Sequence, residues 1–404
     1  MGQGLFARAG TRPTTTSVGE RPTPQRFPQL DAVRGLAAFS VVLWHFALLF
    51  EAGTPFDRAA GWVHLLRVTP LNVLIGGHQA VLVFFILSGF VLTLMLTRGG
   101  GMPYGPYVWR RVTRLYLPYI TVILIAAALN VELYHGRLPE FGLWINQFWH
   151  LPISLGVLLN HVGFVGPFNT DQFDYAIWSL VHEMRISLLF PLLLAAVLKL
   201  GWRRSVVAAG LLSVAVTPLY HLTIARHPNV ATSLLTLHYL LPFTVGTLLA
   251  LHLRDVQRWY AARGRTERVV LAVAAVVSYF VSSLPQTLWG LDTPMILEWL
   301  ALPGATLLLV FALASDRVGR LLAVQPAPFL GRISYSLYLT HPVTMLATLH
   351  LLHGRLPVAL LPVIGLALTV PVATLVYWAV EQPSIRLGHR VAAWTSRRPG
   401  LEAG

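Results

Sequence analysis

The chain has 404 residues, of which 55% are hydrophobic and only 11% are charged, and it contains no cysteine. Soluble domains carry about 25% charged residues, so this chain has too few charges to cover a water-exposed surface. The lack of cysteine excludes disulfides, thiol nucleophiles and cysteine-ligated zinc sites. The net charge of +14 comes almost entirely from arginine at the ends of apolar runs, which favours lipid headgroups over nucleic acid as its partner.

The first 28 residues are rich in Pro, Thr and Arg and contain no apolar run, which predicts a disordered tail. A signal peptide needs an apolar core and a small-residue cleavage site, and neither occurs there. N-myristoylation needs Ser or Thr at the sixth position, where Phe6 stands. We therefore expect a cytoplasmic tail over 1–28, a membrane domain over 29–390 and a second cytoplasmic tail over 391–404.

Long apolar runs predict an all-α integral membrane protein, a bundle of about ten transmembrane helices, because a helix needs about 20 apolar residues to cross a bilayer. If the N-terminus is cytoplasmic, ten spans place 23 basic residues in cytoplasmic segments and 5 in outer segments. The positive-inside rule expects this bias, so we predict that both termini are cytoplasmic. The expected spans are 30–50, 78–97, 115–130, 175–199, 205–222, 231–252, 269–284, 297–314, 333–352 and 358–380.

The apolar stretch 151–165 is a candidate for an eleventh span. Counting it would move the later basic loops to the outside, against the positive-inside rule. We expect instead a re-entrant or interfacial piece of a long outer segment, 131–174. Trp144, Phe148 and Trp149 in this segment suit a membrane interface.

Three ionisable side chains, Asp31, Arg34 and His45, lie in the first predicted helix. Ionisable residues inside a span are costly and are functional candidates by default. Arg34 and His45 share one face at about 100° per residue and are separated by a rise of about 16 Å. His45 is a natural general base near neutral pH. The alternative is structural, with Asp31 and Arg34 as cytoplasmic anchors and His45 as an interface residue.

The motif WSLVHEMR places His182, Glu183 and Arg185 in the fourth predicted helix. Glu183 lies about 12 Å below the outer end of that helix, at a depth similar to that of His45. It is therefore a candidate for orienting His45 or binding an acceptor. His182 and Arg185 share another face and need partners on other helices. A structural ion pair between helices is the alternative.

The ninth predicted helix opens with GRISYSLYLTHP, in which Ser334, Tyr338 and His341 form one polar stripe. Hydrogen bonding between helices would explain this stripe without catalysis. Glu381 ends the tenth predicted helix, where a carboxylate is unfavourable beside the C-terminal dipole. We expect an arginine such as Arg34 as its partner, and a purely structural role is the alternative.

Arg110, Arg111 and Arg114 immediately precede the third predicted helix. Three arginines at a helix N-terminus suit phosphate groups, so this loop is a candidate site for acyl-CoA. Positive-inside topology explains some of these arginines, and an anionic lipid is an alternative ligand. The chain has no HxxxxD, P-loop, GxGxxG or HExxH motif, and no cluster that requires a metal.

Six short motifs in chain order resemble those of the acyltransferase-3 family, the membrane O-acyltransferases that acylate bacterial surface glycans and some macrolides. The likeness covers about 30–390. The motifs are LDAVRGLAAFSVVLWH with Arg34 and His45, AVLVFFILSGFVL, RRVTRLYLP with Arg111 and Arg114, WSLVHE with Glu183, ISYSLYLTHP, and EQPSIR with Glu381.

The resemblance implies ten helices in the bacterial cytoplasmic membrane, a cytoplasmic acyl-CoA donor, most commonly acetyl-CoA, and an acceptor hydroxyl near the outer face. It implies that His45 and Arg34 are essential, that Arg111 and Arg114 lie near the donor and that Glu381 is needed. It leaves open whether His45 is a base or a transient acyl carrier.

One motif departs from the family pattern. An aromatic pair usually follows WSL-x-x-E, where this chain has Ile186 and Ser187 with Arg185 just before them. The acceptor contacts of this helix are therefore expected to differ, and Arg185 is a candidate partner for an anionic acyl group or acceptor.

We therefore predict an acyl-CoA-dependent O-acyltransferase that acts on a cell-surface or exported glycan, or on a lipid-linked sugar. A small secondary metabolite such as a macrolide is an alternative acceptor. A transporter or flippase is an alternative class, because intramembrane ionisable residues also mark substrate pathways. Inverted repeats would favour transport, and none is visible in the sequence. Membrane lipids are expected partners, and the acyl chain, the acceptor and the oligomeric state stay open here.

Overall fold

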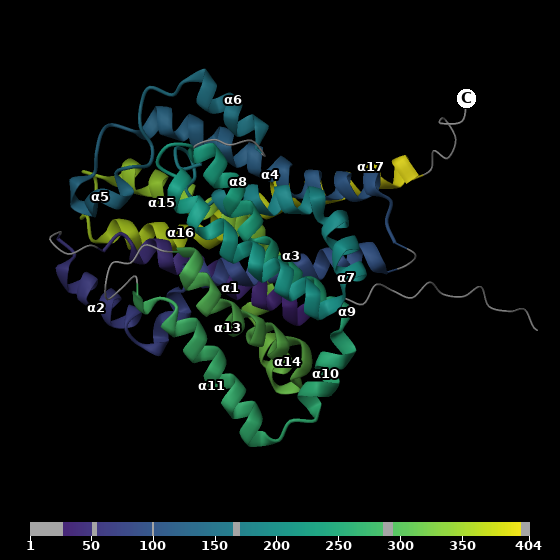
Figure 1. Cartoon of the computed structure of the whole chain (residues 1–404). Helices are drawn as coiled ribbons and strands as arrows, with labels where there is room; N and C mark the ends of the chain where they lie inside the picture. The colour runs from purple at the N-terminus through teal and green to yellow at the C-terminus, as the bar shows by residue number, and fades with distance from the viewer. Residues whose placement is uncertain (1–26, 51–54, 99–100, 165–169, 286–293, 397–404) are drawn as a thin grey trace, which may run out of the picture.

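The computed structural model describes residues 27–50, 55–98, 101–164, 170–285 and 294–396 (Figure 1). All regular elements within these ranges are helices, as the apolar patterning predicts. Seven are long and apolar enough to cross a membrane, by length and composition. Most of both predicted tails falls outside the described residues, whereas 391–396 are helical.

The membrane helices form one bundle, with the shorter elements at its ends (Figure 1). The seven long apolar stretches lie in α1 (Pro28–Ala47), α3 (Gly77–Thr97), α4 (Tyr104–Leu133), α7 (Trp178–Thr223), α8 (Pro228–His238) with α9 (Leu240–Leu251), α13 (Pro294–Ala314), and α16 (Leu360–Val376) with the π-turn η3 (Tyr377–Glu381) and α17 (Gln382–Ser396). The remaining elements are α2 (Asp57–Arg67), η1 (Pro70–Ile75), η2 (Pro139–Phe141), α5 (Gly142–Ile145), α6 (Leu155–Gly163), α10 (Leu253–Ala261), α11 (Arg265–Val281), α14 (Asp316–Leu322) and α15 (Ala327–Leu352).

The 46 residues of α7 make two helices rather than one. Gly201 has φ 74° and ψ 169° in the middle of the element, a conformation that glycine adopts readily because it has no Cβ. The two parts correspond to the predicted spans 175–199 and 205–222. The count of ten crossings stays a prediction, because length and composition identify seven helices in the described chain.

The predicted start of the third span is wrong. We expected a helix from residue 115 after an arginine-rich loop, but α4 begins at Tyr104 and has 30 residues. Arginine is a good helix former, and Pro106 is tolerated in the first turn of a helix. The three arginines therefore lie on the helix itself, and Arg111 is buried inside the bundle.

The stretch 151–165 does not form an eleventh span. Its helix α6 has nine residues, a rise of about 14 Å, whereas the hydrocarbon core is about 30 Å thick. The expected interfacial role of Phe148 and Trp149 is wrong, because both are buried. Phe148 packs on Tyr175, and Trp149 stacks on His350, so this segment covers one end of the bundle.

Helix α1 packs between α3 and α15, in the interior of the bundle. Gly35 and Gly331 face each other where α1 crosses α15, and a Cβ on Gly35 would lie 2.2 Å from the backbone nitrogen of Gly331. Small residues let membrane helices approach this closely. The crossing determines which polar side chains of the two helices meet.

The outward faces of the bundle are apolar. Leu192 is 70% exposed and Leu222 is 74% exposed on α7, and Val270 is 61% exposed on α11. Exposing this much apolar surface to water would be unfavourable, so these faces contact lipid. The chain is accordingly a multi-pass membrane protein.

Candidate functional site

His45 of α1 and His341 of α15 are in direct contact. Nδ1 of His45 lies 2.9 Å from Nε2 of His341, and the two rings stack with centroids 5.0 Å apart. His341 is fully buried, whereas His45 is partly exposed. The sequence marked both residues as candidates but did not predict that they touch.

The hydrogen bonds assign the protons of this pair in its neutral form. Nδ1 of His341 lies 3.2 Å from the carbonyl oxygen of Leu337, which can only accept, so this nitrogen carries hydrogen. Nε2 of His341 is then an acceptor and takes a hydrogen bond from Nδ1 of His45. Nε2 of His45 is left unprotonated. A positioned imidazole with a free lone pair is what general-base catalysis needs.

Two aromatic rings flank His45. The ring of Trp144 stacks on it with centroids 6.0 Å apart and planes 9° apart, and Tyr175 lies at 4.7 Å. Both come from the segment between α4 and α7 rather than from α1 or α15. From the sequence, Trp144 was expected at the membrane interface, and Tyr175 was not a candidate. These rings restrict water around the imidazole and shape the approach to it.

Arg34 is fixed by side chains of two helices. Its Nε donates a hydrogen bond to the Ser334 hydroxyl at 2.8 Å, and Nη2 lies 3.3 Å from the carboxylate of Asp31. Nη2 also donates to the carbonyl group of Gly331. Nη1 makes no hydrogen bond to any described residue, so the guanidinium is oriented and keeps donors for a ligand.

Glu183 does not orient His45, as the sequence suggested it would. Its carboxylate accepts hydrogen bonds from Arg111 at 2.8 Å and from Ser88 at 2.9 Å. Arg111 also donates to the hydroxyl of Ser187 at 2.8 Å. The reason is geometric, because the face of α7 that carries Glu183 meets α3 and α4 rather than α15. This arrangement agrees with the structural alternative for Glu183.

Glu381 lies in the π-turn η3 and is buried. Its carboxylate accepts hydrogen bonds from the backbone N–H and the hydroxyl group of Ser336. The expected ion pair with Arg34 is not formed, since Arg34 pairs with Asp31 on its own helix. Arg34 and Arg114 nevertheless lie near enough to interact electrostatically with Glu381. Short π-turns are frequent at functional sites.

A cavity of about 80 Å³ lies between these polar groups. Arg34, Arg111, Arg114 and Glu183 line it, as do Ser88 and Ser334. Tyr338 and Ser179 also line it and are hydrogen bonded to each other at 2.7 Å.

His45 does not line this cavity. The site therefore has two levels, an arginine level around Arg34 and a histidine level around His45, about 16 Å apart along α1. Tyr338 lies in the same helix between its two stripe partners, Ser334 and His341. The polar stripe of α15 thus extends from the cavity, which Ser334 and Tyr338 line, to the contact of His341 with His45.

Two arginine candidates point elsewhere. Arg185 donates to the hydroxyl of Thr236 at 3.1 Å and to the carbonyl of Thr232 at 3.3 Å, so it faces α8. Arg110 lies on the face of α4 that packs near Gly388 of α17. Of the three arginines of α4, Arg111 and Arg114 line the cavity, and Arg110 is not among its lining residues.

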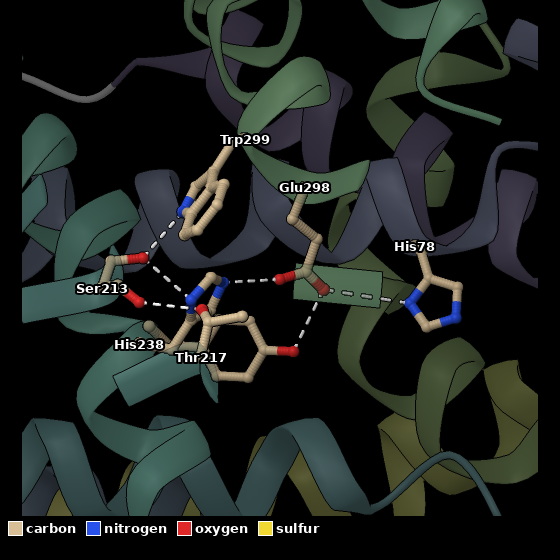
Figure 2. Close-up of polar contacts among 7 residues, drawn as sticks. His78, Ser213, Thr217, His238, Glu298 and Trp299 are labelled. Atoms are coloured by element: carbon tan, nitrogen blue, oxygen red, sulfur yellow. Dashed lines mark hydrogen bonds and ion pairs between the residues drawn. The ribbon is translucent and has the colours of Figure 1, made fainter. Parts of the chain in front are cut away.

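A second buried polar cluster, which the sequence analysis missed, surrounds Glu298 of α13 (Figure 2). Its carboxylate accepts hydrogen bonds from His238 Nε2 at 2.9 Å and from the Tyr239 hydroxyl at 3.1 Å. Figure 2 shows the other side of the His238 ring against Ser213, 2.8 Å from its Nδ1, and His78 beside Glu298 at 4.0 Å. The signal in the sequence was an ionisable residue in each of three predicted spans, His78, His238 and Glu298.

Within the described ranges, no group of three or more His, Asp or Glu side chains is placed to hold a metal ion. The polar groups instead suit acid–base chemistry at His45 and anion binding at Arg34 and Arg114. A family model described as an acyltransferase domain matches residues 27–378 of this chain. The chain belongs to the acyltransferase-3 family.

Curated members of the family match this chain over nearly its whole length. The acyltransferase MdmB of Streptomyces mycarofaciens is 27% identical, over 94% of this chain and 97% of MdmB. The O-acetyltransferase OatA of Staphylococcus aureus is 22% identical, over 94% of this chain and 60% of OatA. YrhL of Bacillus subtilis, provisionally named a peptidoglycan O-acetyltransferase, is 22% identical, over 90% of this chain and 55% of YrhL. No solved structure matches the chain.

The acyltransferase-3 assignment agrees with the resemblance that the six motifs carry. The chain is therefore a membrane acyltransferase of this family. The roles of the individual site residues stay predictions, because a family match over 27–378 does not test any one side chain.

Proposed function

We propose that this chain is an O-acyltransferase of the bacterial cytoplasmic membrane. It moves an acyl group, with acetyl as the leading candidate, from acyl-CoA on the cytoplasmic side to a hydroxyl of a cell-surface or exported glycan. The observation that carries this proposal is the hydrogen-bonded pair of His45 and His341, which leaves Nε2 of His45 free to accept a proton.

In the proposed reaction, His45 Nε2 takes the proton of the acceptor hydroxyl while the hydroxyl oxygen attacks the thioester carbonyl carbon. The tetrahedral intermediate then collapses and the C–S bond breaks. The sulfur of CoA takes the proton back from His45, so CoA leaves as a thiol. The positive charge on His45 is stabilised through its Nδ1 hydrogen bond to His341. General-base assistance of this kind contributes about 10²–10⁴-fold to a rate.

The two levels of the site suit a donor with an anionic end and a reactive end. Arg34, Arg111 and Arg114 line the inner cavity and are candidates for the phosphates of CoA. The motif implies Arg111 and Arg114 near the donor, and Arg110 is a further candidate from the same stretch of α4. The thin pantetheine arm would then cover the interval of about 16 Å to His45. A cavity of 80 Å³ holds only a few water molecules, so the donor requires it to widen.

The glycan acceptor is supported by the name of YrhL, which specifies peptidoglycan, and by that of OatA, which specifies O-acetyl transfer. A small metabolite is the second candidate acceptor. The match to MdmB, over 97% of that relative, is compatible with either acceptor, because its name specifies none.

The test is a knockout strain complemented with wild type, with His45→Ala or with His353→Ala. His353 pairs with Glu140 at one end of the bundle and serves as a matched histidine control. Mass spectrometry of the surface glycan should show an acyl increment that the knockout lacks, that wild type and His353→Ala restore, and that His45→Ala does not. Purified protein should also consume acetyl-CoA only when His45 is present.

Full glycan acylation by His45→Ala would overturn the role of His45. An unchanged glycan in every strain, with acetyl-CoA turnover by the purified chain, would favour a small-molecule acceptor. An absence of acyl-CoA turnover together with substrate movement would favour the transporter class.

A further inference from the structure

A long groove lies on the side of α1 that faces away from the candidate site. It has a volume of about 1440 Å³, and its walls are α1, α11 and α13, with α10 and α14 at one end. Figure 1 shows α11 at the outer edge of the bundle, where it lies beside α13. Pockets for drug-sized ligands measure about 300–1,000 Å³, so this groove suits a larger and more extended molecule.

The groove has a basic end. Arg263 lines it from the turn between α10 and α11, Arg265 and Arg268 line it from the first turn of α11, and Arg317 and Arg320 line it from α14. One lining carboxylate, Asp316, faces these five arginines. Arg263 pairs with Glu267 and Arg268 donates to a backbone carbonyl. Arg265, Arg317 and Arg320 are exposed and form no ion pair with any residue that the structure describes.

The rest of the groove is apolar. Along α11, residues 265 to 279 cover about 21 Å, which is most of the depth of a hydrocarbon core. Tyr279 closes the far end, where its hydroxyl donates to the carbonyl of Gly76. On α1, Leu36 lines the groove and is 44% exposed, although it belongs to an interior helix. This exposed apolar side chain suits contact with lipid acyl chains.

We propose that this groove binds a phospholipid with an anionic headgroup. The arginines hold its phosphate, and its acyl chains lie between α1, α11 and α13. Arginine recognises phosphate through several N–H donors, and basic pockets between membrane helices on the cytoplasmic side attract anionic lipid headgroups. The inference rests on the orientation in the proposed function, which puts these arginines on the cytoplasmic side.

The groove touches α1 on the side opposite the candidate site. Leu36 lies two residues from Arg34, which at 3.6 residues per turn puts it on roughly the opposite face of the helix. The acyl chains therefore touch α1 from behind and never meet the reacting groups.

The test uses the purified full-length chain and native mass spectrometry with phosphatidylglycerol or phosphatidylcholine. Wild type should retain phosphatidylglycerol in preference to phosphatidylcholine. Arg317→Gln/Arg320→Gln should lower the affinity for phosphatidylglycerol about thirtyfold, since each arginine near an anionic surface contributes about 1 kcal/mol. Arg203→Gln/Arg204→Gln, two arginines in the turn of α7 outside the groove, should retain the wild-type preference.

A second variant tests the apolar part. Ala272→Trp on α11 places a large ring in the groove, and it should reduce lipid retention while leaving the arginines in place. Equal binding of the two lipids by wild type, or an equal loss in both arginine pairs, would overturn the proposal. Displacement of the lipid by acyl-CoA would assign the groove to the donor instead. Lipid retention without any acyl transfer would count against the proposed function alone.

Discussion

The proton on Nδ1 of His45 is directed by His341 and, behind it, by the carbonyl group of Leu337. Together they select the tautomer in which Nε2 of His45 is the basic atom. His341 is thus a positioning residue, which acts on the substrate through His45. Trp144 and Tyr175 flank the same ring and limit its movement.

We expect His341→Ala to lower kcat on the order of 10²-fold, because His45 then loses the acceptor that selects its tautomer. The KM for the donor should stay near the wild-type value, since the arginine level is untouched. His341→Gln offers a side-chain oxygen as an acceptor and should recover part of the rate. Steady-state kinetics of the purified variants measure both constants, and an equal loss with Ala and Gln would contradict a positioning role.

The crossing of α1 and α15 brings the two levels of the site together. Its tightest point is the contact between Gly35 and Gly331, where neither residue has a side chain. On α15, Ser334 and His341 lie on the face that this contact turns toward α1. The relative position of the two helices therefore controls the Arg34 and His45 contacts at once.

We expect Gly35→Ala to destabilise the chain by about 1–3 kcal/mol, the usual cost of overpacking, because its Cβ would meet backbone atoms that cannot move independently. Acyl-transfer activity should also fall strongly, since α1 and α15 must move apart and the contacts of Arg34 and His45 between them are then weakened. Thermal unfolding in detergent and acyl-transfer assays measure the two effects. Gly210→Ala is the control, because no atom lies within 4 Å of its added Cβ, and equal behaviour of both variants would contradict the argument.

At the scale of the whole molecule, the Glu298 cluster joins helices that are far apart in the sequence. It brings together α3, α7, α8 and α13 through His78, Ser213 and His238 (Figure 2). Tyr239, which directly follows α8, also donates to Glu298. Glu298 is 4% exposed, and Trp299 donates to the hydroxyl of Ser213 from the next position. Buried polar groups with satisfied hydrogen bonds specify one arrangement of the helices.

We expect Glu298→Ala to cost about 3–5 kcal/mol in the free energy of unfolding, because it leaves His238 and Tyr239 buried without their acceptor. Glu298→Gln keeps one acceptor oxygen and should cost less. Denaturation in detergent measures this order. Glu267→Ala, at an exposed ion pair on α11, should change stability little, and a comparable loss there would contradict the proposed importance of the cluster.

The orientation of the molecule can be tested with single cysteines, because the chain has none of its own. Arg204 and Arg355 are both exposed. The predicted topology places Arg204 on the cytoplasmic side of the membrane and Arg355 on the outer side. In intact cells, a membrane-impermeant maleimide should label Arg355→Cys at once and Arg204→Cys only after permeabilisation. The positive-inside bias is the physical reason. The reverse labelling pattern would show that both termini are on the outer side.

Local properties of the sequence were sufficient to predict the fold class of the molecule. Apolar runs of membrane length with arginines between them predicted a helical membrane protein, and most helix positions follow, because these signals depend on neighbours in the sequence. The motifs also named His45, Arg34 and His341 as candidates. The start of α4 was missed because charged residues at a membrane boundary remain good helix formers.

The partners of the polar side chains were decided only by tertiary structure. A helix repeat of 3.6 residues gives the direction of each side chain, but the helix it faces depends on crossings such as Gly35 with Gly331. For this reason His45 meets His341 rather than Glu183, and Glu381 meets Ser336. The groove behind α1 also forms only when α11 and α13 pack beside it.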